Sequence, residues 1–110
     1  MTFFHEDNIE FEVLEMGKIK RKIKAFDGSL MTVEVYFEDG AQGYTHQHVH
    51  EQICYCLEGE FDFTVEDITK KIKSGDSIYI KSNIPHGCKL LSHKGRLLDI
   101  FTPIREDFLK

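Results

Sequence analysis

Turn signals recur along this chain at short intervals. At each of them a glycine stands beside a polar residue, a combination that marks tight turns. They lie at Asp27-Gly28, Asp39-Gly40, Glu58-Gly59, Ser74-Gly75-Asp76 and Lys94-Gly95. The pieces between them have the length of strands, so the chain is predicted to fold as a sandwich or barrel of many short strands.

The segments between these turns alternate apolar and polar residues. β-Branched and aromatic residues recur with a two-residue period in segments 30–38, 61–66, 77–80 and 96–101, which is typical of strands with one buried face. Segment 103–110 offers at most a short turn or a terminal helix, and no linker or internal repeat divides the chain. We therefore expect one all-β domain spanning all 110 residues, a length sufficient for a single hydrophobic core.

The charge balance narrows the class of partner. The formal net charge of -5 disfavours nucleic acid, because phosphate binding requires a basic surface. The one basic run, residues 17–24, alternates lysine with apolar residues. We interpret it as a strand whose lysine-rich face is solvated or protects a sheet edge.

The sequence shows no signal for export or membrane insertion. The N-terminus has no basic region followed by a long apolar core, and no segment has the length needed to cross a bilayer. The three cysteines, Cys54, Cys56 and Cys88, form no Cys-x-x-Cys pair, which disfavours both a disulfide framework and a zinc ribbon. We expect a cytoplasmic protein with reduced core thiols that binds neither membrane nor nucleic acid.

Histidines gather in one short segment. His46 and His48 are separated by a single residue, and Gln52 follows at the same parity. Residues i and i+2 of a strand lie about 7 Å apart on one side, so the imidazoles of His46 and His48 are expected to converge on one metal ion. Gln52 can join that ion only if the chain bends between Val49 and Glu51, and we predict such a bend.

A fourth ligand has to come from elsewhere in the chain. The best candidate is His86, which follows the strand predicted at 77–80. His50 shares the parity of the other clustered histidines but would be a fifth ligand, so we assign it to the rim of the pocket. His5 and His93 match no pattern and are expected on the surface.

The spacing of these residues resembles the two motifs of the cupin family. Gly40, His46, His48, Gln52 and Gly59 stand at the offsets of the first motif, in which glutamine replaces the usual glutamate. The resemblance implies a conserved double-stranded β-helix, or jelly-roll barrel.

The second cupin motif is matched only in part. Gly75 and His86 stand at its offsets, whereas Lys81 and Asn83 replace the usual proline and glycine. The ligand position is therefore kept while two positions of the scaffold are changed. The metal ligands that the resemblance implies are His46, His48, Gln52 and His86.

These four ligands are all neutral. A bound divalent cation would keep its full charge and act as a Lewis acid toward an anionic substrate. Many iron oxygenases use two histidines and one carboxylate, so this set weakens an oxygenase function without excluding it. Imidazole and oxygen ligands suit several metals; zinc or nickel is expected in a purified sample, with manganese or iron as alternatives.

The neighbours of Gln52 follow the alternation of a strand. Cys54 and Cys56 share its parity and are expected to line the interior of the barrel. Glu51 and Tyr55 have the opposite parity. Glu51 should therefore point away from the metal, and Tyr55 should have a packing role.

An acidic residue stands in the last predicted strand. Asp99 shares one face with Phe101 among strongly apolar neighbours, and a buried carboxylate is costly unless it is paired. Asp99 therefore either has a structural partner, such as Arg105 or a backbone amide, or serves as an acid–base group.

These C-terminal residues extend the resemblance to the KdgF-type cupins, which linearise unsaturated uronates in pectin and alginate breakdown. Asp99, Phe101 and Arg105 preserve the spacing of that family's acid, aromatic and arginine. The resemblance implies that Asp99 moves a proton, Arg105 binds the substrate carboxylate and Phe101 walls the pocket. The implied reaction converts a cyclic 4,5-unsaturated uronate into linear 5-keto-4-deoxyuronate.

Other functions stay open from the sequence. A non-catalytic sugar-binding or sensory cupin would use the same metal site, and the fold also permits a dioxygenase or another sugar isomerase. The expected partner is a small sugar acid. Apolar N-terminal residues could add a strand at a two-fold interface, so we predict a homodimer. These residues are Phe3, Phe4, Ile9, Phe11, Val13 and Leu14.

Overall fold

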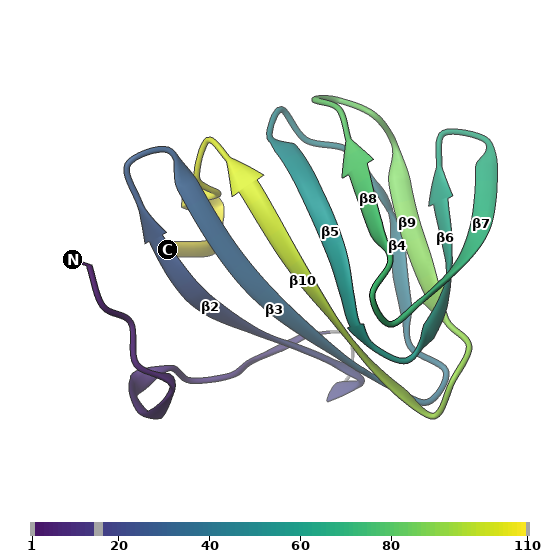
Figure 1. The fold of residues 1–110 in the computed structure, drawn as a ribbon, viewed down its shortest axis with the longest axis horizontal. Helices are drawn as coiled ribbons and strands as arrows, with labels where there is room; N and C mark the ends of the chain where they lie inside the picture. Colours follow the sequence, from purple (N-terminus) through teal and green to yellow (C-terminus); the bar gives the residue numbers. More distant parts are fainter. Residues whose placement is uncertain (1, 15–16, 110) are drawn as a thin grey trace.

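Two antiparallel sheets make up the computed structural model, which describes residues 2–14 and 17–109. The larger sheet has the order β1-β2-β3-β10-β5-β8, and the smaller has the order β4-β9-β6-β7 (Figure 1). The elements are η1 (Glu6–Asn8), β1 (Glu12–Leu14), β2 (Ile19–Asp27), β3 (Leu30–Glu38), β4 (Gln42–His46), β5 (Glu51–Glu58), β6 (Glu60–Val65), β7 (Ile68–Lys73), β8 (Ser77–Ile80), β9 (His86–Leu90), β10 (Lys94–Thr102) and η3 (Glu106–Leu109). No helix of the described residues is long and apolar enough to cross a membrane.

This arrangement confirms the predicted all-β jelly roll. Segments 30–38 and 77–80 coincide with β3 and β8, and the predicted terminal helix is η3. The predicted turn at Lys94-Gly95 is wrong, because both residues belong to β10. Gly95 is required there for close packing instead, since a Cβ atom on it would lie 2.6 Å from Cζ of Phe61.

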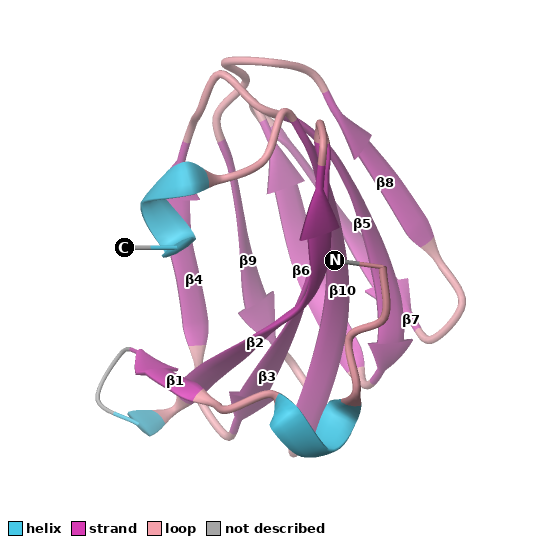
Figure 2. Cartoon of the chain, turned by 90° about the vertical axis from the view of Figure 1, so that its left-hand side faces the viewer, coloured by secondary structure: helices cyan, strands magenta, loops and turns pink. Residues whose placement is uncertain are grey.

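The core lies between the two sheets, which face each other in Figure 2. Phe37 of β3 meets Phe61 of β6 edge-on, with ring centroids 5.0 Å apart, so the two layers are joined by direct aromatic contact. Cys54 and Cys56 are fully buried, as predicted from their parity. Tyr55, which has the opposite parity, lies on the outer face and is 37% exposed.

The N-terminal segment runs along β2 and covers its lysine-rich face. Lys22 and Lys24 both form ion pairs with Glu6 of η1. Phe11 packs edge-on against Tyr36 of β3, and its ring lies 4.3 Å from Nζ of Lys22. The strand predicted within 17–24 is confirmed as part of β2, but its lysine face is covered by other residues and not simply solvated.

The apolar N-terminal residues are used in part within the chain. β1 pairs with β2, with Glu12 opposite Arg21, and Phe4 packs on Phe26 at 5.4 Å between ring centroids. Phe3 remains exposed. The added strand therefore forms on the chain's own sheet, and the homodimer stays a prediction.

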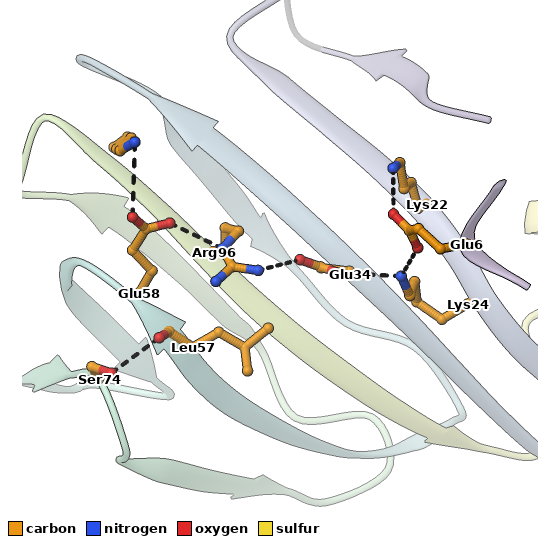
Figure 3. Close-up of polar contacts among 9 residues, drawn as sticks. Glu6, Lys22, Lys24, Glu34, Leu57, Glu58, Ser74 and Arg96 are labelled. Atoms are coloured by element: carbon orange, nitrogen blue, oxygen red, sulfur yellow. Dashed lines mark hydrogen bonds and ion pairs between the residues drawn. The ribbon is translucent and has the colours of Figure 1, made fainter. Parts of the chain in front are cut away.

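A network of charges crosses four strands on the outer face of the larger sheet (Figure 3). Its centre is Glu34, which is only 6% exposed. Nη1 of Arg96 lies 2.8 Å from Glu34, Nζ of Lys24 lies 3.5 Å from it, and Nε of Arg96 donates to Glu58. Burial alone would raise the pKa of Glu34, but hydrogen bonds from Tyr36 and Arg96 and the charge of Lys24 hold it below its usual value.

Replacing Arg96 by methionine is therefore expected to destabilise the fold by about 2 kcal/mol, because Glu34 would stay buried without its closest charged partner. Urea unfolding measures this change. The matched control is Lys71→Met, which removes an exposed ion pair with Glu60 and should cost less than about 0.5 kcal/mol. Equal losses in the two variants would contradict a central role for Glu34.

Candidate metal centre

Three imidazoles meet at one end of the space between the sheets. His46 ends β4, His86 begins β9 opposite it, and His48 lies in the loop that leads to β5. One ring nitrogen from each residue lies within 4.8 Å of the others. The predicted convergence is confirmed, although His48 reaches the cluster from a loop and not from the same strand as His46.

Backbone carbonyl groups orient all three rings. In each ring Nδ1 lies 2.9 or 3.0 Å from the backbone oxygen of a residue two positions away in sequence. Donation to a carbonyl places the proton on Nδ1, which leaves the lone pair on Nε2 for a ligand. This is the orientation that metal-binding histidines require.

The buried nitrogen of His86 fits a metal site. Its Nε2 is shielded from solvent and has no hydrogen-bond partner among the described residues. Burial lowers the pKa of His86 to about 4 and also lowers that of His48, so both rings are neutral at physiological pH. An unpartnered neutral imidazole is costly unless it coordinates something, and a divalent cation suits it.

The predicted bend brings Gln52 to the cluster. The chain bends at residues 49 and 50, and β5 begins at Glu51, whose side chain turns outward to accept a hydrogen bond from Tyr79. Gln52 is 5% exposed, and its Oε1 lies 3.1 Å from Nε2 of His48. Both expectations about this segment are confirmed, and an amide oxygen stands beside the three imidazoles.

Gln52 also joins the cluster to Asp99. Its Nε2 donates to Oδ1 of Asp99 at 2.9 Å, and Cys54 lies directly opposite Asp99 on the neighbouring strand. Burial raises the pKa of Asp99 to about 6, and the interactions of the carboxyl group with Cys54 and Gln52 oppose that rise. The sequence left open a structural partner or an acid–base role for Asp99. The structure supplies a hydrogen-bond donor, the side-chain amide of Gln52, in place of Arg105 or a backbone amide.

Arg105 is held beside two aromatic rings. Its Nε and Nη2 donate to Asp107 at 3.1 and 2.9 Å, and this hydrogen bonding lowers the pKa of that carboxyl. Its guanidinium lies 5.3 Å from the ring centroid of Phe101 and 4.1 Å from that of Phe108. Phe101 is 3% exposed and meets His48 edge-on.

One cavity of about 440 Å³ brings these groups together, a volume suited to a small molecule. Its polar and aromatic lining includes His46, Gln52, His86, Asp99, Phe101 and Arg105. Three of the four predicted metal ligands and the predicted C-terminal residues thus share one hollow. His48 does not line it, but its ring centroid lies 5.5 Å from that of His46 and 5.0 Å from that of His86.

The sequence reasoning missed one residue of this cavity. Arg21 of β2 lines it, is held by Glu12 through two hydrogen bonds of 2.8 and 2.9 Å, and lies 3.7 Å from the ring centroid of Phe108. Arg21 shares the parity of Ile19 and Ile23, which are apolar residues of the inner face. This shared parity was the sequence signal that Arg21 faces inward, and the neighbouring lysines obscured that signal.

The remaining histidines lie outside the cavity lining. His50 packs beside His48 and Phe101, with ring centroids 5.5 and 6.4 Å away, next to the cavity but not among its lining residues. His5 is exposed, and His93 is exposed and bound to Asp39, as expected for surface residues.

Comparison with known proteins agrees with this architecture. A family model described as "Cupin domain" matches residues 33–101. The chain belongs to the cupin family. Within that family this cupin is 39% identical over 108 residues to the pectin degradation protein KdgF of Dickeya dadantii (strain 3937), with 97% of each chain covered.

Solved structures of similar cupins share the whole fold. KdgF from Halomonas sp. matches with a TM-score of 0.91 and 33% identity, over 98% of each chain. An RmlC-like cupin from Shewanella frigidimarina NCIMB 400 matches with a TM-score of 0.91 and 37% identity, over 98% of this cupin and 96% of that chain. The resemblance to KdgF-type cupins is thereby confirmed.

Replacing His86 by alanine is expected to abolish tight binding of one zinc or nickel ion, because it removes the buried imidazole of the cluster. Elemental analysis measures the bound metal. The matched control is His93→Ala, an exposed histidine outside the cavity, which should bind metal like the wild type.

A second readout of this prediction uses no metal count. Metal added to chelator-treated wild-type protein should raise its thermal midpoint, since a ligand of the native state stabilises it by about 2.7 kcal/mol at a hundredfold excess over Kd. His86→Ala should lose most of that gain. If His86→Ala matched the wild type in metal content and in the gain of thermal midpoint, the assignment of His86 as a metal ligand would be contradicted.

Proposed function

We propose that this cupin converts a cyclic 4,5-unsaturated uronate into linear 5-keto-4-deoxyuronate. The main support is the hydrogen bond between Gln52 and Asp99, which links a candidate acid–base group to the imidazole cluster inside one cavity. The relative from Dickeya dadantii is named as a pectin degradation protein, and pectin is a polymer of uronates.

The chemistry needs one proton carrier and no co-reactant. In the cyclic substrate a double bond joins C4 and C5, and O5 closes the ring to the anomeric carbon C1. Asp99 takes the proton of the anomeric hydroxyl, a carbonyl forms at C1, and the C1–O5 bond breaks to leave an enolate across O5, C5 and C4. Return of the proton to C4 leaves a ketone at C5, so the reaction is an isomerisation.

The residues around Asp99 would hold the metal. His46, His48, Gln52 and His86 would bind one divalent cation, with zinc or nickel expected and manganese or iron as alternatives. When bound, such a cation supplies Lewis-acid stabilisation of negative charge that develops on oxygen.

Arg105 and Phe101 position the substrate. Asp107 occupies Nε and Nη2 of Arg105, which leaves Nη1 to donate to the substrate carboxylate. Phe101 packs between His48 and Phe108 and keeps water from the wall of the cavity. Arg21 adds a second positive group to the same wall.

Metal-loaded protein is expected to accelerate the loss of cyclic unsaturated galacturonate, followed by NMR. Asp99→Asn should lower kcat by about a hundredfold or more, because it removes the proton carrier while its amide oxygen can still accept from Gln52. The matched control, Asp62→Asn on β6, should keep the wild-type rate.

Each outcome of this experiment has a distinct meaning. No acceleration by the wild type over buffer would refute the proposed reaction. Turnover that survives Asp99→Asn would refute only the role of Asp99 and leave the proposed reaction standing. Sugar-acid binding without turnover, unaffected by Asp99→Asn, would favour a non-catalytic binding or sensory cupin.

A second prediction concerns Gln52→Glu, which introduces the usual cupin ligand. A glutamate still offers oxygen to a metal, but it cannot donate the hydrogen bond that orients Asp99, and its charge repels that carboxylate. We expect retained metal content by elemental analysis and a kcat lowered by about tenfold or more. Wild-type kcat in this variant would show that the amide donor is dispensable.

A further inference from the structure

We propose that Cys54 is a positioning residue that fixes the orientation of the Asp99 carboxylate. This inference rests on the proposed function, in which Asp99 carries the proton.

The register of the larger sheet places the two residues face to face. Cys54 of β5 lies directly opposite Asp99 of β10, which sets its thiol beside the carboxylate. Cys54 is 0% exposed. β5 and β10 each have a hydrogen-bonded neighbour on both sides, so the backbone that carries this pair is held firmly.

Two donors are needed to orient a carboxylate. The terminal torsion of aspartate is soft, so a single hydrogen bond leaves the group free to rotate about that contact. Gln52 supplies one bond at 2.9 Å, and its Oε1 lies 3.1 Å from Nε2 of His48. In this proposal the thiol of Cys54 donates the second hydrogen bond, and Asp99, which lines the cavity, keeps further lone pairs for the substrate.

A thiol suits this position for a physical reason. Cysteine packs as a small apolar side chain, so Cys54 fills the core beside Asp99. Its S–H group is a weak donor, which orients the carboxylate without occupying it as strongly as a hydroxyl would. Valine would fill similar space but donate nothing.

The chain provides a matched control two residues away. Cys56 lies on the same strand and is also 0% exposed. Its Sγ lies 3.7 Å from the backbone oxygen of Glu58 and 3.6 Å from that of Gly59, so its partners are in the β5–β6 turn and not in the cavity. Cys56→Ala therefore leaves a similar hole in the core while Asp99 keeps both of its donors.

The kinetic test compares Cys54→Ala, Cys54→Ser and Cys56→Ala, all metal-loaded and with metal content measured. We expect Cys54→Ala to lower kcat by about tenfold with KM within about twofold, since a misoriented proton carrier slows the chemical step. Cys54→Ser keeps a donor and should recover most of the rate. Cys56→Ala should lose stability but retain kcat.

A spectroscopic test does not depend on turnover. The S–H stretching band of Cys54, assigned by infrared difference against Cys54→Ala, should shift to higher frequency in Asp99→Ala, whereas the Cys56 band should not move. An unshifted Cys54 band, or kcat losses equal in Cys54→Ala and Cys56→Ala, would overturn the proposal. Failure of the wild type to turn over substrate, with the band shift intact, would refute the reaction and leave the contact standing.

Discussion

The pairing of β10 with β5 is the interaction on which the site depends. Its register sets Asp99 opposite Cys54 and Phe101 opposite Gln52, while β3 holds β10 from the other side. A slip of one residue would turn Asp99 and Phe101 toward the outer face of the sheet. Because β10 is paired on both sides, its side chains are fixed relative to β5. Residues far apart in the sequence therefore meet at one point.

The amide of Gln52 explains how a metal cluster and a carboxylate coexist in a buried space. Its Oε1 faces His48, and its Nε2 donates a hydrogen bond to Asp99. A glutamate at this position would set two carboxylates in contact, and like charges at that distance cannot both ionise without a large cost. The departure from the usual cupin motif and the presence of Asp99 are therefore two parts of one arrangement.

The cavity wall is completed by segments that carry no cupin motif. Phe108 of η3 lies against both Arg105 and Arg21, each of which is anchored by its own carboxylate partner. Glu12 of β1 thus helps to shape the cavity, together with Asp107 near the C-terminus. The ends of the chain serve the site as well as the stability of the sheet.

Local sequence determined which segments form strands and which residues could bind metal. The two-residue period located β3 and β8, because it depends on neighbours close in sequence. The resemblance to the two cupin motifs identified His46, His48, Gln52 and the distant His86 as a convergent set. Only the tertiary structure decided the partners of Asp99, the place of Arg21 in the cavity, the burial of Glu34 and the role of Gly95. Each of these depends on strand register or on a distant covering segment, and neither is encoded in the period of a single strand.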